Sequence, residues 1–331
     1  MNLSSPRDAR LAVLEDRDIG LSIVVPVYDE EGSVAELYRR LVDVVAMLDR
    51  TTEIIFVDDG SRDGTLEELT RLYEVDPTVR IISLRRNFGK TPALLAGFAE
   101  ARGRYVITLD GDLQDDPAEL PRFLEALDGG MDLVSGWKKV RHDPVSKTLP
   151  SRLFNFTVRR ATGIPLHDFN CGFKGYRREV LDEVKLYGEL HRFIPVMAFR
   201  RGFRIGEIDV QHHPRRFGKS KFGAGRFVKG MIDFATVMFL TRYMQQPLQL
   251  FGGLGLGLWF LGLLGFIYIL ILKLLGQSVF ASHGPLLFLS GILIVSGIQL
   301  IMLGLLGEML RNYAFRSTEE YSVKQRLARD T

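Results

Sequence analysis

Cysteine is nearly absent from this chain of 331 residues, since Cys171 is the only one. A single cysteine excludes a disulfide within the chain and favours a reducing compartment. The first 20 residues are charged and lack an apolar core, so we expect no signal peptide. The net charge is only +3, so the composition gives no reason to expect nucleic acid as a partner.

Charged residues are missing from two long stretches near the C-terminus. No Asp, Glu, Lys or Arg occurs from Pro247 to Leu272 or from Gly284 to Gly307. Each stretch exceeds the roughly 20 residues with which a helix spans a bilayer. Two buried core helices are the alternative, but this length favours membrane spans at 247–273 and 284–310. A flippase or channel is disfavoured because the stretches lack charged residues that would mark a polar pathway.

Basic residues flank these two stretches unequally. They precede the first stretch and follow the second, at Arg226, Lys229, Arg242, Arg311, Arg316, Lys324, Arg326 and Arg329. The connecting loop 277–283 has no Lys or Arg. The positive-inside rule therefore predicts a multi-pass protein of the inner (cytoplasmic) membrane with both termini in the cytoplasm. We also expect a juxtamembrane helix at 226–245 and a cytoplasmic tail at 311–331.

Small residues are frequent in the first apolar stretch, at Gly252, Gly253, Gly255, Gly257, Gly262 and Gly265. Glycines let two helices approach closely inside a membrane. The contact could be with the second span or with another subunit. We expect a homo-oligomer, with no indication of its order.

The first two-thirds of the chain alternates short apolar runs with helical patterns. After a flexible polar lead at 1–18, we expect strands at 21–28, 54–57, 81–84, 105–109 and 132–135. Helical patterns occupy the intervals between them. This alternation predicts an α/β fold with a mostly parallel sheet covered on both faces. In such sheets, ligands bind beyond the carboxyl ends of the strands.

Acidic residues follow three of these strands, in the pairs Asp29/Glu30, Asp58/Asp59 and Asp110/Asp112. Because the carboxyl ends of parallel strands meet at one edge, we expect the three pairs to share a site. Gly111 permits the bend that would turn Asp110 and Asp112 into one space. An octahedral Mg²⁺ or Mn²⁺ would accept two carboxylates and the amide oxygen of Gln114. An acidic turn without a metal is the alternative.

Two segments resemble the end of a P-loop: Gly89-Lys90-Thr91 and Gly218-Lys219-Ser220. A P-loop needs a further glycine five residues before the glycine of its Gly-Lys pair. This chain has Leu84 and His213 at those two positions. We therefore reject a P-loop NTPase. The cation-rich segment 212–221 is either a solvated loop or an anion site with arginine forks. The basic, amphipathic segment 147–162 is either an ordinary surface helix or a helix at the membrane interface.

Four ordered motifs carry a resemblance to a known family: VPVYDEE (25–31), VDDGSRDGT (57–65), LDGDLQDDP (109–117) and DFNCGFKGY (168–176). They resemble the inverting family 2 glycosyltransferases, which have a GT-A fold. With the two spans, the chain is similar to the polyisoprenyl-phosphate glycosyltransferases. That group includes dolichol-phosphate mannose synthases, bactoprenol glucosyltransferases and aminoarabinose transferases of lipid A modification. The resemblance covers about residues 20–310 and implies a cytoplasmic GT-A catalytic domain at 19–225.

The resemblance also implies roles for individual residues. The nucleotide-sugar donor would be bound by Pro26, Tyr28, Glu30, Val57, Asp59, Asp110, Gly111 and Asp112. The metal, Mg²⁺ or Mn²⁺, would be held by Asp110, Asp112 and Gln114. The phosphate of the lipid acceptor or of the donor would be received by Arg215, Arg216, Lys219 and Lys221. Asp168 would lie near the reaction centre, as a positioning group or as a base. Some mannose synthases have an arginine after the fifth strand, where this chain has Trp137-Lys138-Lys139.

The implied reaction is inverting transfer of a sugar to a polyprenyl phosphate, undecaprenyl or dolichyl, at the cytoplasmic face of the bilayer. UDP-glucose is the preferred donor, because the DFNCGF stretch most resembles bactoprenol glucosyltransferases; GDP-mannose and a UDP-aminosugar stay open. A processive polysaccharide synthase is disfavoured, because the chain has no QxxRW motif and only two spans. A non-catalytic membrane scaffold is disfavoured because both carboxylates of the DxD motif are present.

Overall fold

The computed structural model describes residues 19–139, 145–184, 190–214 and 247–314. The chain divides into two compact units, Met1–Phe234 and Ala235–Thr331. The predicted segments 1–18 and 226–245, and residues 315–331 of the predicted tail, lie outside the described residues.

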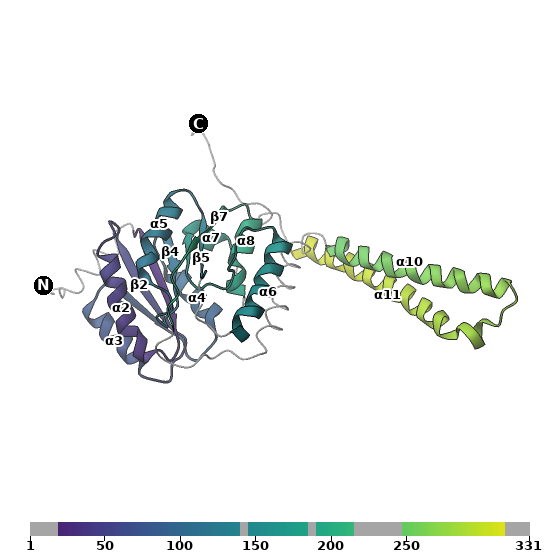
Figure 1. The fold of residues 1–331 in the computed structure, drawn as a ribbon, viewed down its shortest axis with the longest axis horizontal. Helices are drawn as coiled ribbons and strands as arrows, with labels where there is room; N and C mark the ends of the chain where they lie inside the picture. Colours follow the sequence, from purple (N-terminus) through teal and green to yellow (C-terminus); the bar gives the residue numbers. More distant parts are fainter. Residues whose placement is uncertain (1–18, 140–144, 185–189, 215–246, 315–331) are drawn as a thin grey trace, which may run out of the picture. The chain divides into compact units, whose positions relative to one another are not determined.

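A seven-stranded sheet forms the centre of the first unit (Figure 1). Its strands are β1 (Leu21–Val27), β2 (Thr52–Asp58), β3 (Val79–Ser83), β4 (Tyr105–Thr108), β5 (Leu133–Trp137), β6 (Lys174–Arg177) and β7 (Ile205–Asp209). The strand order is β3-β2-β1-β4-β6-β5-β7. Neighbouring strands are parallel except at β6, which is antiparallel to both β4 and β5. The predicted α/β fold with a mostly parallel sheet is confirmed.

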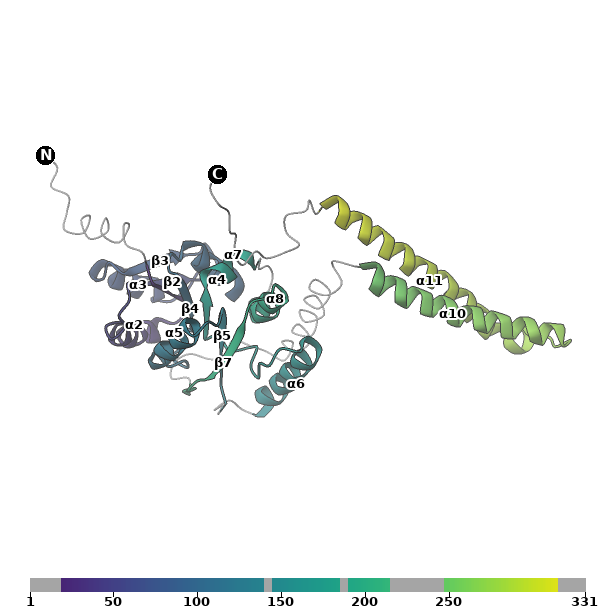
Figure 2. The same cartoon turned by 90° about the horizontal axis from the view of Figure 1, so that it is seen from above.

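Helices cover both faces of this sheet, as Figures 1 and 2 show. They are α2 (Glu31–Val45), α3 (Thr65–Val75), α4 (Lys90–Glu100), α5 (Leu120–Asp128), α6 (Val145–Thr162), α7 (Arg178–Glu183) and α8 (Ile194–Arg200), with 3₁₀ turns η1 (Pro117–Glu119) and η2 (Leu190–Phe193). Side chains alternate along the strands, so each strand contributes to two cores. Ile23 of β1 packs in the core with α2 and α5, and Val24 packs in the core with α4 and α8.

The second unit contains two long apolar helices, α10 (Pro247–Leu274) and α11 (Val279–Ala314). By length and composition, Pro247–Leu274 and Ser282–Leu310 are long and apolar enough to cross a membrane. Only 17% and 11% of their most apolar windows are buried, whereas a core helix of a soluble protein would be mostly buried. The backbone of α11 is not helical at His283, two residues before Pro285.

Glycines bring α10 and α11 into close contact. A Cβ atom built on Gly255 would lie 2.6 Å from the carbonyl oxygen of Gly297, and one on Gly262 would lie 2.7 Å from that of Ser290. Both positions therefore require glycine. By contrast, a Cβ on Gly253 or Gly257 would meet nothing within 4 Å. Some of the glycines noted in the sequence thus pack inside the hairpin, and the homo-oligomer stays a prediction.

Candidate active site

The loop that follows β2 is held by buried carboxylates. Asp59 accepts hydrogen bonds from the backbone N–H groups of Phe88, at 2.7 Å, and Gly89, at 2.9 Å. Burial raises the pKa of Asp59 above its usual range, although these two hydrogen bonds oppose the shift. Asp58 accepts from the N–H of Ser61 at 3.0 Å and from the hydroxyl of Ser83 at 2.9 Å. The pair therefore fixes the loops around the carboxyl end of β2.

The loop that follows β1 is joined to these residues. Asp29 has a positive φ of 49°, and its carboxylate accepts from the N–H of Arg62 at 2.8 Å. The buried side chain of Glu30 accepts from the hydroxyl of Ser33 at 2.9 Å, while its own N–H donates to Thr65 Oγ1. Hydrogen bonds therefore join the loops that follow β1 and β2, and the site shared by the three acidic pairs stays a prediction.

Asp110 lies at the carboxyl end of β4 and is in contact with Lys90, the first residue of α4. The Lys90 ammonium donates to Asp110 Oδ1, and the side chains are 27% and 32% exposed. Although burial opposes ionisation, Lys90 and Lys138 hold the pKa of Asp110 well below its usual range. On another side is the backbone of Gly172, where a Cβ atom would lie 2.5 Å from Asp110 Oδ1. Asp110 is therefore ionised and closely surrounded.

The turn after Asp110 is tight. A Cβ on Gly111 would lie 2.6 Å from Val27 Cγ1, so this position must be glycine for β4 to end against β1. Leu113 has a positive φ of 61°, which few residues other than glycine adopt. The carboxylate of Asp112 accepts from the N–H of Gln114 at 3.2 Å. This hydrogen bond holds the Asp112 side chain within the turn, and a space shared with Asp110 stays a prediction.

The two lysines that follow β5, Lys138 and Lys139, differ in their surroundings. The ammonium of Lys138 lies 2.7 Å from Asp115 Oδ1, and its side chain is only 13% exposed. The other oxygen of Asp115 accepts from the N–H of Asp110 at 3.2 Å. Lys139 points elsewhere, to Asp209, with 62% exposure. Of the two lysines after β5, Lys138 is therefore the one that contributes positive charge to the site.

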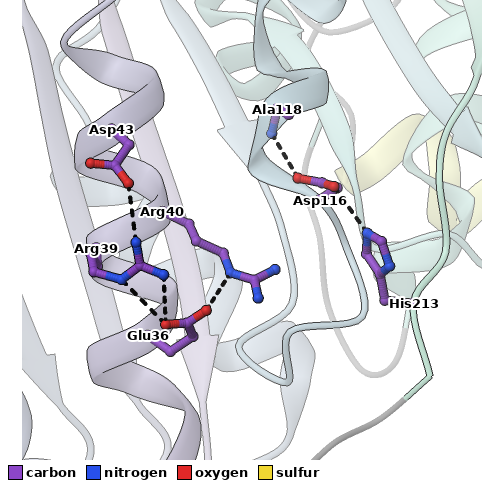
Figure 3. Close-up of polar contacts among 7 residues, drawn as sticks. All are labelled: Glu36, Arg39, Arg40, Asp43, Asp116, Ala118 and His213. Carbon is purple, nitrogen blue, oxygen red and sulfur yellow. Dashed lines mark hydrogen bonds and ion pairs between the residues drawn. The ribbon is translucent and has the colours of Figure 1, made fainter.

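The segment after β7 is attached to the residues that follow the DxD motif (Figure 3). Asp115 and His212 form an isolated antiparallel bridge, and the N–H of His213 donates to the carbonyl of Gln114 at 2.9 Å. The His213 ring lies 2.9 Å from the carboxylate of Asp116, which also caps Ala118 at 3.0 Å. Although burial opposes it, these partners hold the pKa of Asp116 below its usual range.

Asp168 is almost fully buried, with 1% exposure. Its carboxylate accepts from the N–H of Asn170 at 3.0 Å and from the amide of Asn155, on α6, at 3.4 Å. Its own N–H donates to Glu207 of β7 at 3.0 Å. This environment favours a positioning role over a base role, because the carboxylate holds the loop that carries Gly172.

The other residues predicted to bind the nucleotide-sugar donor differ in their exposure. Pro26 and Tyr28 are half-buried at the end of β1, in a position to face a ligand beyond the strands. Val57 is fully buried, and its side chain packs toward Gly97 of α4, so only its backbone could meet a nucleotide. The predicted phosphate ligands Arg215, Arg216, Lys219 and Lys221 lie outside the described residues.

Sequence reasoning missed several residues of this site. Lys90 was part of the rejected P-loop pattern, and Asp115 was not singled out although it belongs to the same motif as Asp110. His191, from η2, lies in a hydrogen bond of 2.7 Å with the Thr91 hydroxyl. Burial, together with Lys90, holds the pKa of His191 well below its usual range, so this imidazole is neutral. No local pattern could have joined residues 100 positions apart.

The residues at the end of β4 fit a hard divalent cation. Two carboxylates, Asp110 and Asp112, stand two residues apart at the end of β4, and Asp110 already accepts one cationic group, the ammonium of Lys90. Among the described residues, no group of three or more His, Cys, Asp or Glu side chains is arranged as a metal site. Mg²⁺ in phosphate-transferring sites is commonly bound by one or two carboxylates plus substrate phosphates and water. The donor set therefore suits a metal that is completed by its substrate.

Comparison with known proteins decides the family. The family model "Glycosyl transferase family 2" matches residues 22–185. The dodecaprenyl-phosphate galacturonate synthase of Rhizobium johnstonii is 39% identical over 317 residues, which is 93% of each chain. The chain belongs to glycosyl transferase family 2. This family 2 glycosyltransferase is also 39% identical to the undecaprenyl-phosphate 4-deoxy-4-formamido-L-arabinose transferase of Pseudomonas aeruginosa, over 88% of its own length and 84% of the relative's. The predicted resemblance to polyprenyl-phosphate glycosyltransferases is confirmed.

Solved structures share the fold of this glycosyltransferase. Glucosyl-3-phosphoglycerate synthase from Mycobacterium tuberculosis, in complex with Mg²⁺ and UDP, superposes with a TM-score of 0.52 at 18% identity. The alignment covers 71% of this chain and 85% of that one. The same enzyme has been solved with Mn²⁺, UDP and glucosyl-3-phosphoglycerate, with a TM-score of 0.50. At such identity the likeness shows the GT-A fold alone.

Proposed function

We propose that this enzyme transfers a sugar from a nucleotide sugar to a polyprenyl phosphate, with inversion at the anomeric carbon, at the cytoplasmic face of a membrane. The observation that carries the proposal is the bend at Asp110 and Asp112, flanked by Lys90 and Lys138, at the carboxyl ends of the central strands. Sequence identity of 39% with two polyprenyl-phosphate sugar transferases, over most of this chain, supports polyprenyl phosphate as the acceptor.

Asp110 and Asp112, with Gln114, would hold Mg²⁺ or Mn²⁺. When bound, the cation neutralises charge that builds on the leaving nucleoside diphosphate. The chain itself orients this centre: Asp115 holds the N–H of Asp110, and Lys138 balances the charge of Asp115. The nucleotide would lie beyond β1 and β2, near Pro26, Tyr28, Glu30 and Asp59.

The acceptor phosphate is already an anion at neutral pH, so its oxygen needs little help from a general base. The main task of the enzyme is then to orient two anionic reactants, which requires cations around them. Arg215, Arg216, Lys219 and Lys221 are our candidates for the lipid phosphate. Asp168 would position the loop 168–172 at the site. In-line attack behind the leaving group would give an inverted product.

Membrane attachment brings the enzyme to its lipid acceptor. We propose that α10 and α11 form a hairpin across the bilayer, with both termini in the cytoplasm. The charge distribution around the two helices and their exposed apolar side chains support this topology. The predicted interface helix at 147–162 corresponds to α6, on which Phe156 is 66% exposed. An exposed phenylalanine on a basic helix suits a membrane surface.

The donor sugar is the least determined part of the proposal. The two relatives are named for galacturonate and for 4-deoxy-4-formamido-L-arabinose, and both are 39% identical to this chain. Neither name supports glucose, which was our preferred sugar from the sequence. We therefore propose a UDP-sugar modified at C4 or C6 as the first donor to test, with UDP-glucose and GDP-mannose as alternatives.

The test is transfer of radiolabelled sugar to undecaprenyl phosphate by purified protein in detergent. Donors are supplied one at a time, with Mg²⁺, Mn²⁺ or a chelator. We expect label in the lipid phase from one donor, and only with a divalent cation. Absence of label from every donor, together with no binding of UDP or GDP, would favour a non-catalytic scaffold instead.

A further inference from the structure

Lys90 places its ammonium directly on the first carboxylate of the DxD motif, that of Asp110. It begins α4 and belongs to the segment Gly89-Lys90-Thr91, which looked like the end of a P-loop but lacked the rest of that motif. Its contact with Asp110 is partly open to solvent on both sides of the pair. Water and ions can therefore reach the two side chains.

The position of Lys90 is fixed by its neighbours on both sides. Gly89 has a φ of 97°, and its N–H is held by the carboxylate of Asp59 at 2.9 Å. The hydroxyl of Thr91 is in a hydrogen bond of 2.7 Å with the buried ring of His191. A lysine on a freely moving loop would pair with any nearby acid, whereas this one is directed at Asp110 by the start of its helix.

Lys90 and a divalent cation both require the carboxylate of Asp110. Lys90 donates to Oδ1 of Asp110, and the backbone of Gly172 closes another side of that carboxylate. Two cations that share one carboxylate repel each other, so a metal that binds Asp110 must weaken or displace the ammonium. The displaced ammonium would then lie beside the phosphates that complete the metal's coordination. A lysine ammonium is a suitable point charge for phosphate oxygens.

We propose that Lys90 is a built-in cation that exchanges between two partners, the carboxylate of Asp110 in the empty enzyme and the diphosphate of the donor in the loaded enzyme. This inference rests on the proposed function, because it requires a donor bound through a metal at Asp110. In the empty enzyme, Lys90 lowers the affinity of Asp110 for the metal. With the donor bound, it adds to the affinity for the diphosphate. Metal and donor therefore bind cooperatively, and Lys90 carries part of the coupling.

The experiment measures Mn²⁺ binding to the full-length protein in detergent by electron paramagnetic resonance, with and without UDP or GDP as the probe. Lys90→Met removes the charge and keeps the length of the side chain. We expect this variant to bind Mn²⁺ alone about fivefold more tightly than the wild type, as loss of one partly exposed competing ion pair would give. At saturating Mn²⁺, we expect it to bind the nucleoside diphosphate about tenfold more weakly.

Two further variants make the result specific. Lys139→Met is the matched control, because Lys139 is exposed and pairs with Asp209 on β7. It should bind Mn²⁺ and the diphosphate as the wild type does. Lys90→Arg keeps the charge, so its Mn²⁺ affinity should stay close to that of the wild type. This variant separates loss of the charge from a general effect of replacing residue 90.

Unchanged or weaker Mn²⁺ binding by Lys90→Met would overturn the competition between Lys90 and the metal. Tighter Mn²⁺ binding with unchanged diphosphate affinity would overturn the exchange to phosphate. Failure of the proposed function looks different, because the wild type itself would then bind neither UDP nor GDP at any Mn²⁺ concentration. The Mn²⁺ titrations without nucleotide would still decide whether Lys90 competes for Asp110.

Discussion

Acidic residues lie at both ends of the central strands, and their surroundings differ. At the amino ends, Glu53 accepts from the Ser22 hydroxyl at 2.6 Å and from the N–H of Arg102 at 2.7 Å. Its second oxygen lies 3.3 Å from Arg80, and its side chain is 5% exposed. At the carboxyl ends, Asp110 is 32% exposed and faces a lysine side chain.

This difference in surroundings separates a carboxylate that stabilises the fold from one that is available to bind a ligand. One oxygen of Glu53 accepts from the Ser22 hydroxyl and from a backbone N–H, and Ser22 itself accepts from the N–H of Gly103 at 2.8 Å. Asp110 has a partner on a long side chain, and Asp112 stands two residues away. A carboxylate with fixed partners serves the fold, whereas one with an exchangeable cation can receive a ligand.

The largest effect should come from Asp112→Asn. The amide keeps the shape of the side chain but removes the charge that a divalent cation needs. We expect sugar transfer to fall by about 10²–10³-fold, as when one electrostatic contact to a transition state is lost. The thermal unfolding temperature in detergent should stay close to that of the wild type. Full activity of this variant would remove Asp112 from the metal site.

Glu53→Ala should lower the stability of the protein and leave its sugar transfer largely unchanged, the opposite of Asp112→Asn. It leaves the hydroxyl of Ser22 and the N–H of Arg102 without the carboxylate that accepts from them, whereas Arg80 keeps its contacts with Glu100. We expect a loss of about 2–4 kcal/mol in the free energy of unfolding. Transfer per folded molecule should change little, since the cluster is at the other end of the strands. A selective loss of activity without loss of stability would contradict the structural role.

Gly172→Ala tests how closely Asp110 is surrounded. The added Cβ would lie 2.5 Å from Asp110 Oδ1 and would push the carboxylate away from its present position. We expect Mn²⁺ affinity and transfer to fall by about 10–100-fold, the range seen when the surroundings of metal ligands are altered. Gly163→Ala, at a glycine with no atom within 4 Å of the added Cβ, serves as a control for stability because its φ of 73° adds backbone strain without touching the site. Equal metal affinity in the two variants would refute the close approach.

The smallest expected effect concerns the hairpin of α10 and α11. Gly255→Leu would place a side chain against the carbonyl of Gly297, where a Cβ alone would lie 2.6 Å away. We expect the two helices to separate at a cost of about 1–3 kcal/mol, the usual range for overpacking. Gly253→Leu is the matched control, because its Cβ meets nothing within 4 Å. Thermal unfolding in detergent should distinguish the two, and equal unfolding temperatures would show that Gly255 tolerates a large residue.

The sequence predicted those parts of the fold that have a local signal. The apolar runs at 21–28, 54–57 and 105–109 gave β1, β2 and β4 within a few residues, and the acidic pairs followed their carboxyl ends. By contrast, β6 (Lys174–Arg177) was missed, because four residues with lysine, glycine and arginine have no apolar pattern. Its place depends on pairing with β4 and β5, which are distant in the chain.

The same limit applies to the site. Asp110 and Asp112 could be found because two carboxylates and a glycine follow a strand directly. Lys90 is 20 positions away from Asp110, and its role depends on the helix that starts there. Lys138 could not be separated from Lys139 by sequence, because which of them turns inward depends on the backbone after β5. Residues that meet only in space, such as Lys90 and Asp110, can be identified as partners only once the fold is known.

The most direct measurement is metal-dependent transfer of labelled sugar to undecaprenyl phosphate, with wild type, Asp112→Asn and Glu53→Ala in parallel. Each rate is normalised to the amount of folded protein, and the thermal unfolding temperature is recorded for each variant. We predict that Asp112→Asn loses transfer and keeps its stability, whereas Glu53→Ala keeps transfer and loses stability. The reverse pattern, or equal loss of transfer in both variants, would contradict the assignment of the chemistry to the carboxyl ends of the strands.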